Sequence, residues 1–129
     1  MNHNFENLGV WQRGCRQAVN VCVASNKSRD FAHKDQIQRS AISIPSTIAK
    51  GAERVSDADF ARFLFYSKGS CAELRTQLMI HREVCHELDV EPFANTDGTI
   101  EETKEISRML SGFIGHLKPP SSLFRDSRF

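Results

Sequence analysis

The sequence predicts an all-α protein, folded as an antiparallel up-and-down four-helix bundle. Four segments carry apolar residues at the three- and four-residue spacing of a helix, and none shows the alternation of a strand. Only four prolines and seven glycines interrupt the 129 residues, and 40% of the residues are hydrophobic. This length and composition suit one globular domain. Short connections between the segments make successive helices antiparallel neighbours.

The first helix is predicted over residues 5–25. Its apolar stripe consists of Leu8, Trp11, Cys15, Ala18 and Cys22. The stripe follows helical spacing, so we expect Trp11 to lie in the core as a structural residue.

The second helix is predicted over residues 35–54. Its stripe is Ile37, Ala41, Ile44, Ile48 and Val55, with Gly51 in the same seam. Pro45 removes one backbone hydrogen bond inside this segment. We therefore predict one helix with a kink near residues 40–43 rather than two helices.

The third helix, predicted from Asp57 to Asp89, has the most regular pattern. Its seam reads Phe60, Leu64, Ser67, Cys71, Leu74, Leu78, His81, Cys85 and Leu88. Alternating spacings of four and three are typical of coiled-coil packing. Asp57 is the predicted N-cap, and small side chains at Ser67 and Cys71 would let a neighbouring helix approach closely.

A second apolar face is predicted on this same helix. Phe63, Tyr66, Ile80 and Val84 lie off the seam, where a lone bundle would leave them partly exposed. We expect these four residues to form an interface between subunits.

The fourth helix is predicted to begin at Thr99, because Thr99 and Glu102 match a capping box. Its stripe is Ile100, Thr103, Ile106, Leu110, Phe113 and Leu117. Pro119 and Pro120 end the helix, which gives a bundle domain over residues 1–118 and a flexible tail over 119–129.

Charge is distributed unevenly along the chain. Residues 1–54 hold eight Lys/Arg against four Asp/Glu, whereas residues 55–117 hold six against eleven. Such asymmetry indicates an interaction surface, although basic and acidic helices can also complement each other. The candidate nucleic-acid-binding residues are Arg13, Arg16, Lys27, Arg29, Lys34, Lys50 and Arg54. Lys27, Arg29 and Lys34 gather at one predicted end of the bundle.

The chain carries no signal-peptide pattern at its start and no apolar run of about 20 residues, so we expect a cytoplasmic protein without a membrane segment. In that compartment its four cysteines stay reduced. His81 and Cys85 share one helical face and could seed a metal site, but they lie in the packing seam. One Glu-x-x-His pattern, Glu83 to His86, is too little for a di-iron centre. We therefore expect no metal, no cofactor and no catalytic residues.

Several motifs, taken in order, resemble the 23S rRNA intervening-sequence protein family. They are residues 5–12 (FENLGVWQ), 36–45 (QIQRSAISIP), 48–51 (IAKG) and 60–64 (FARFL), followed by Gly69, Ser70, Glu73 and Leu74. The resemblance covers about residues 5–117. It departs from the family pattern at Gln38, where the first of two arginines usually stands, and at Lys50, where a glutamate is usual.

The resemblance implies a ring-shaped homopentamer of four-helix bundles without enzymatic activity. It marks Arg39, Pro45, Gly51 and Glu73 as structural, with Arg39 and Glu73 as a candidate buried pair. A similar fold serves as the accessory variability protein of diversity-generating retroelements, which associates with a reverse transcriptase and nucleic acid. The predicted function is therefore a nucleic-acid-binding or ribonucleoprotein accessory factor. The alternative is a protein–protein adaptor that uses the second apolar face or the tail residues Phe124 and Phe129.

Overall fold

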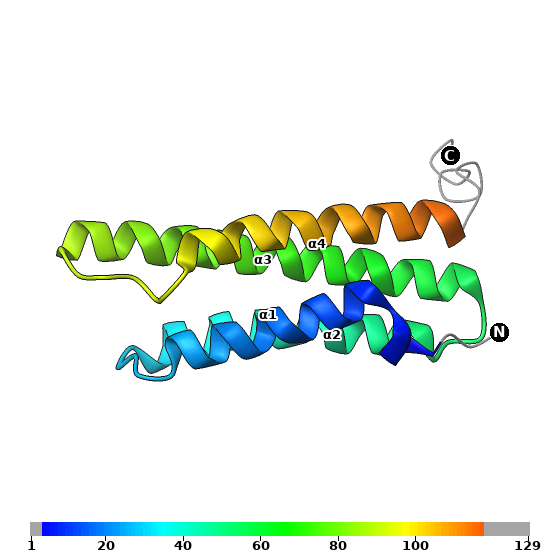
Figure 1. The fold of residues 1–129 in the computed structure, drawn as a ribbon, viewed down its shortest axis with the longest axis horizontal. Helices are drawn as coiled ribbons and strands as arrows, with labels where there is room; N and C mark the ends of the chain where they lie inside the picture. The colour runs from blue at the N-terminus through cyan, green and yellow to red at the C-terminus, as the bar shows by residue number, and fades with distance from the viewer. Residues whose placement is uncertain (1–3, 118–129) are drawn as a thin grey trace.

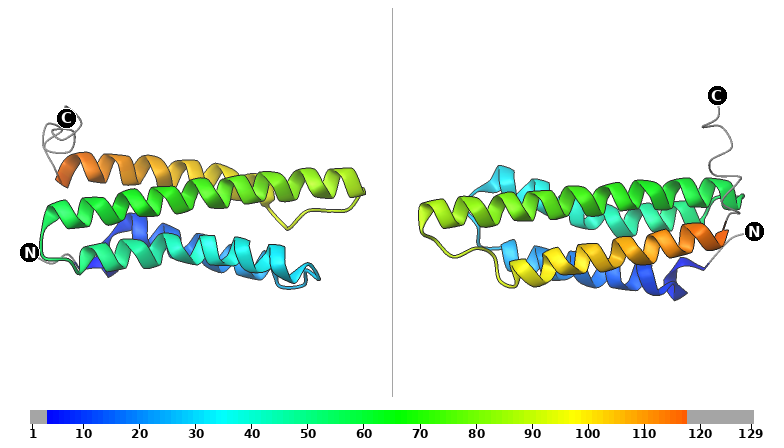
Figure 2. Two further views of the ribbon diagram at one scale, coloured as in Figure 1. Left: turned by 180° about the vertical axis from the view of Figure 1, so that it is seen from behind. Right: turned by 90° about the horizontal axis from the view of Figure 1, so that it is seen from above.

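The computed structural model describes residues 4–117, apart from the side chains of residues 31 and 32. A short 3-10 turn, η1 (Phe5–Asn7), precedes four helices: α1 (Gly9–Ser25), α2 (Phe31–Ala52), α3 (Asp57–Leu88) and α4 (Thr96–Leu117). The two helical hairpins lie on each other, with α3 against α2 and α4 against α1 (Figures 1 and 2). No strand occurs within residues 4–117. The all-α, antiparallel four-helix prediction is confirmed.

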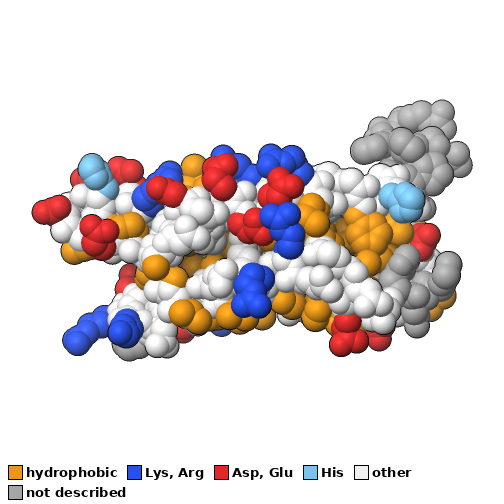
Figure 3. All heavy atoms as spheres, in the orientation of Figure 1, with side chains coloured by type: hydrophobic (Ala, Val, Ile, Leu, Met, Phe, Trp, Pro, Cys, Tyr) orange, Lys and Arg blue, Asp and Glu red, His pale blue; other side chains and the backbone are white. Residues whose placement is uncertain are grey.

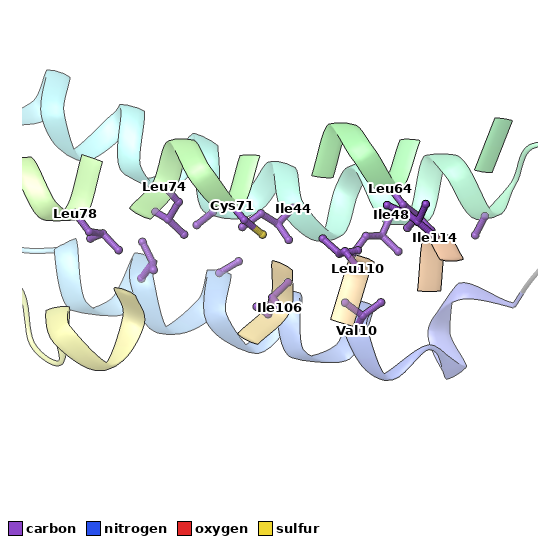
Figure 4. Close-up of a cluster of buried hydrophobic side chains, with 14 of the residues drawn as sticks. Val10, Ile44, Ile48, Leu64, Cys71, Leu74, Leu78, Ile106, Leu110 and Ile114 are labelled. Atoms are coloured by element: carbon purple, nitrogen blue, oxygen red, sulfur yellow. The ribbon is translucent and has the colours of Figure 1, made fainter. Parts of the chain in front are cut away.

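One continuous core runs along the axis of the bundle (Figure 4). Its fully buried side chains come from α2, α3 and α4, including Ile44, Leu64, Leu74, Ile106 and Leu110, each 0% exposed. Burying several such side chains at about 1.5–3 kcal/mol each supplies the main driving force for folding.

The predicted core face of α1 is wrong by about one residue. The buried positions are Val10, Gly14, Gln17, Ala18, Val21 and Ser25, whereas Leu8, Trp11, Cys15 and Cys22 are only partly buried. The chain enters α1 through η1, and Phe5 packs edge-on against Trp11 with ring centroids 5.2 Å apart. That contact holds Trp11 at the rim of the core rather than inside it.

Helix α2 passes through Pro45 as one helix, as predicted. Small polar residues let α3 approach it closely. Ser67 donates a hydrogen bond to the Ile44 carbonyl at 3.0 Å, and the hydroxyls of Ser43 and Ser70 lie 2.7 Å apart. The prediction that Ser67 marks a close helix contact is confirmed.

Several predicted helix ends differ from the structure. The Ser56 hydroxyl, rather than Asp57, caps α3 by accepting the Asp59 N–H at 3.1 Å. Val55 and Leu88 are predicted in core stripes, but they are 82% and 66% exposed. Val55 lies in the α2–α3 connection, and Leu88 is the last residue of α3.

Helix α4 begins at Thr96, three residues before the predicted start. Thr99 is therefore inside the helix, where its hydroxyl donates to the Asn95 carbonyl at 2.9 Å, so the predicted capping box is wrong. The last described helical residue is Leu117. The predicted tail, with Phe124 and Phe129, lies outside the described residues.

Candidate functional site

The structure divides the predicted basic residues into ion-paired and unpaired groups. Arg13 belongs to the first group: its Nε and Nη2 donate to the two carboxylate oxygens of Glu102 at 2.9 and 2.6 Å. This hydrogen bond also raises the pKa of Arg13. Bidentate pairing of this kind fixes geometry, so Arg13 clamps α1 to α4. The prediction that Arg13 also contacts nucleic acid stays a prediction.

Arg54 is also engaged within the bundle. Its Nε lies 3.4 Å from an Asp59 carboxylate oxygen, and its guanidinium lies 5.1 Å from the centre of the Phe63 ring. These contacts stabilise the α2–α3 connection. Lys50 is exposed in the last turn of α2, where a cation favours the helix dipole. Lys34 is half-buried and has an interaction partner within the protein, so it is not counted among the unpaired cations.

The remaining cations lie along one exposed edge that runs from α1 into the α1–α2 connection. Arg16, Asn20, Val23 and Lys27 recur at spacings of four, three and four, and all are exposed; we call them the α1 ridge. Arg29 continues the ridge into the α1–α2 connection. No ion pair among residues 4–117 involves Arg16, Lys27 or Arg29. Basic side chains gather over this connection at the lower left of Figure 3.

The second apolar face of α3 is exposed at three of its four predicted positions. Tyr66, Ile80 and Val84 are 55%, 53% and 47% exposed, and we call them the α3 outer face. Phe63 is half-buried and packs within the bundle, against Gly51 and edge-on to the Tyr66 ring at 5.6 Å. Phe63 therefore belongs in part to the α2–α3 contact.

The candidate pair of Arg39 and Glu73 does not form in the structure. Both residues are exposed, and no ion pair among the described residues joins them. Glu73 instead accepts a hydrogen bond from the Ser40 hydroxyl at 3.0 Å. A serine one residue along α2 thus takes the place that the resemblance gives to arginine.

His81 and Cys85 are buried in the core, as predicted. The His81 ring stacks on Phe93 with centroids 3.8 Å apart, and its Nε2 accepts the Phe93 N–H at 3.0 Å. Cys85 Sγ lies 3.7 Å from the same Nε2. His81 thereby fastens the α3–α4 connection to α3. The described residues contain no group of three or more His, Cys, Asp or Glu side chains that could hold a metal ion.

This arrangement makes His81 a source of pH-dependent stability. Burial lowers its pKa, and the neighbouring His33 lowers it further, while Asp30 opposes the shift. The unfolded chain then binds more protons than the folded one as pH falls below about 6.5, so the free energy of unfolding decreases there. We expect urea unfolding at pH 7.5 and 5.5 to show this loss in the wild type and a smaller loss in His81→Gln. Replacing the exposed His116 with glutamine should leave the loss unchanged, and an equal loss in both variants would contradict the assignment.

The four cysteines are free thiols. Burial raises the pKa of Cys71 to about 12, which leaves that thiol protonated and unreactive at neutral pH. No helix between residues 4 and 117 is both long and apolar enough to cross a membrane.

One hollow in the surface near the ridge gives no signal in the sequence pattern. A pocket of about 240 Å3 opens between α1 and the start of α4, and Gln17 and Asn20 contribute to its lining. Gln17 is 3% exposed. An amide inside an apolar stripe gives no periodicity signal. Gln17 is recognised as buried only once the structure shows which face of α1 packs against the core.

Fold and surfaces together define a small four-helix-bundle protein. A basic ridge runs from its first helix into the first connection, and an apolar outer face lies on its longest helix. The chain belongs to the 23S rRNA-intervening sequence protein family, whose model matches residues 6–112. This match reaches from η1 into the second half of α4 and confirms the family resemblance. No curated protein matches the chain.

Proposed function

We propose that this chain is a non-catalytic cytoplasmic homo-oligomer that binds nucleic acid as an accessory factor, alone or beside a nucleic-acid-processing protein. The observation that carries the proposal is the α1 ridge with Arg29, where three cations lack an acidic partner among the described residues. Unpaired cations are available to neutralise phosphates. Cations and amides on a ridge attract phosphate but supply no nucleophile, so the proposed role is binding.

The geometry of the ridge suits a phosphate chain. The helical stretch from Arg16 to Ser25 spans about 14 Å at about 1.5 Å per residue, and Lys27 lies two residues beyond the end of α1. Val23, 71% exposed between them, offers an apolar contact to a sugar or base. The ridge can thus follow several nucleotides in one direction.

Assembly would multiply this weak site. The α3 outer face offers three half-exposed apolar side chains, and Gln77 on the same side of α3 has a buried Oε1 without a hydrogen-bond partner among the described residues. A second copy of the chain seated there would cover the apolar atoms. The family resemblance gives the number five, which head-to-tail contacts in a closed ring permit.

Charge favours such a head-to-tail contact. Residues 1–54 carry a net charge of +4, from eight Lys/Arg and four Asp/Glu, and residues 55–117 carry −5, from six Lys/Arg and eleven Asp/Glu. A basic first hairpin of one subunit can therefore meet the acidic second hairpin of the next. Each additional subunit also adds one more α1 ridge to the assembly, and such multivalency strengthens weak phosphate contacts.

Binding to mixed-sequence single-stranded RNA tests the proposal. We expect the affinity to fall as NaCl rises from 50 to 300 mM, because phosphate contacts release counterions. The double variant Lys27→Ala/Arg29→Ala should bind at least tenfold more weakly. Its slope of log K against log salt should be shallower by about 0.7 for each phosphate that the variant no longer neutralises. Fluorescence anisotropy of a labelled oligonucleotide measures both quantities.

A matched control removes the same charge elsewhere. Arg62 and Arg108 are exposed and pair with acids on their own helices, so Arg62→Ala/Arg108→Ala should keep nearly all of the affinity. Equal losses in the two double variants would show only a net-charge effect and would refute a ridge-specific site.

The alternative is an adaptor that binds protein alone, and the α3 outer face is the observation that favours it. Wild-type protein without measurable RNA or DNA binding at 50 mM NaCl would favour this alternative over the nucleic-acid proposal.

A further inference from the structure

The pocket between α1 and the start of α4 lies directly beside the α1 ridge, because Arg16 and Asn20 belong to both. Its volume of about 240 Å3 is below the range for drug-sized ligands and suits one small molecule or part of a chain. The lining residues used below are Arg16, Gln17, Asn20, Asn95, Gly98 and Glu102.

Gln17 is the unusual member of this lining. The residue is only 3% exposed, and its Oε1 has no hydrogen-bond partner among the described residues. Its Nε2 donates to the Thr99 carbonyl at 3.3 Å, which fixes the amide against α4. A buried acceptor without a donor lowers stability, and leucine would fill the same space without that cost. Because Gln17 also lines the pocket, a rotation of its amide would bring this oxygen to a donor supplied from outside the chain.

The mouth of the pocket favours an anion, whereas the Gln17 oxygen in its wall favours a hydrogen-bond donor. The first-turn N–H groups of α4, a helix of 22 residues, carry the positive end of the helix dipole. Asn95 precedes that turn with a φ of 58°, and its side chain lies over Gly98, where any β-carbon would meet it. Arg16 adds an exposed guanidinium at the rim. Glu102 is also present, but Arg13 already neutralises its carboxylate.

We propose that this pocket takes a single nucleotide unit, with its phosphate between Arg16 and the start of α4 and an N–H of its base donated to Gln17 Oε1. Asn20 and Asn95 present further amides to the base edge, and amides are the side chains that pair with base edges in two directions. The inference rests on the proposed nucleic-acid binding and deepens it: the α1 ridge follows the backbone while this pocket receives one nucleotide.

Titration of the full chain with 5′-AMP, adenosine and inorganic phosphate, followed by amide NMR shifts, tests the pocket without any polymer. We expect 5′-AMP to bind at least tenfold more tightly than either part alone and to shift the amides of residues 96–99. Gln17→Leu and Arg16→Ala should each raise the dissociation constant for 5′-AMP at least fivefold. Arg62→Ala, which removes an arginine from a distant surface of α3, should change it less than twofold.

Thermal unfolding distinguishes a ligand-binding glutamine from a structural one, because only loss of a structural glutamine lowers stability. Gln17→Leu should be at least as stable as the wild type, because the unpaired oxygen is gone. If that variant does not fold, the exposed Asn20→Ala replaces it, with an expected loss of at least threefold. No binding of 5′-AMP, or equal binding by the wild type and the pocket variants, would overturn the inference.

The two proposals fail in different ways. RNA binding that persists in Gln17→Leu while 5′-AMP does not bind would overturn the pocket and keep the ridge. Binding of 5′-AMP that depends on Gln17, without any RNA binding, would support the pocket and overturn the proposed function.

Discussion

Replacing Ile80 with aspartate should turn the assembled protein into a 14.6 kDa monomer that keeps its helices. Ile80 is 53% exposed on the α3 outer face, so the bundle itself tolerates a charge there. In the proposed assembly the same position is covered by a second subunit, and an unpaired charge buried in an apolar contact costs several kcal/mol. Light scattering after size exclusion gives the mass, and circular dichroism gives the helicity.

Met79 provides the matched control, because it is the next residue on α3 and is similarly exposed at 45%. It lies outside the outer face, so Met79→Asp should leave the assembly intact. A wild-type mass of one subunit would refute the assembly, whereas a dimer would keep the interface and discard the pentamer. Equal dissociation by both variants would place the interface elsewhere or spread it around the helix.

Phe63→Asp is a weaker test of the same interface. The Phe63 ring lies under the Arg54 guanidinium and its β-carbon faces Gly51, so the substitution disturbs the α2–α3 contact inside one subunit. Loss of assembly in that variant would not separate folding from association. Ile80 separates them because its side chain is directed away from the core seam.

The pattern of α3 was sufficient to predict that helix, but the pattern of α1 was not. In α3 the seam from Phe60 to Cys85 is the only regular 4–3 stripe, and every member of it is buried. Helix α1 has two neighbouring apolar stripes, one through Trp11 and one through Val10 and Val21. The buried stripe also contains Gln17, so hydrophobicity alone favours the wrong face.

The candidate binding residues could be predicted as a set but not sorted from the sequence. Arg13 and Arg16 look equivalent in α1, yet Arg13 reaches Glu102, a residue 89 positions away. Arg16 has no ion-pair partner among residues 4–117. Local spacing reports only partners on the same helix. Which cations stay free depends on how α1 and α4 pack, and that information is tertiary.

Replacing Gly51 with alanine should destabilise the bundle by about 1–2 kcal/mol. A β-carbon there would lie 2.6 Å from Phe63 Cβ and 2.9 Å from Phe60 Cδ1. Phe60 is 1% exposed and Phe63 Cβ is fixed to the α3 backbone, so neither can move without shifting a helix. Overpacking of this kind costs about 1–3 kcal/mol, which exceeds the gain of less than about 1 kcal/mol that alanine brings to a helix.

Gly69 separates the packing effect from helix propensity. It lies in the middle of α3, is exposed, and a β-carbon there would meet nothing within 4 Å. Gly69→Ala should therefore stabilise the protein by about 0.5–1 kcal/mol through propensity alone. Urea denaturation of both variants should give free energies of unfolding that differ by about 1.5–3 kcal/mol, since opposite signs are expected. If Gly51→Ala proved as stable as Gly69→Ala, α2 and α3 would not be held at this distance, and the close contact through Ser67 and Gly51 would not define the fold.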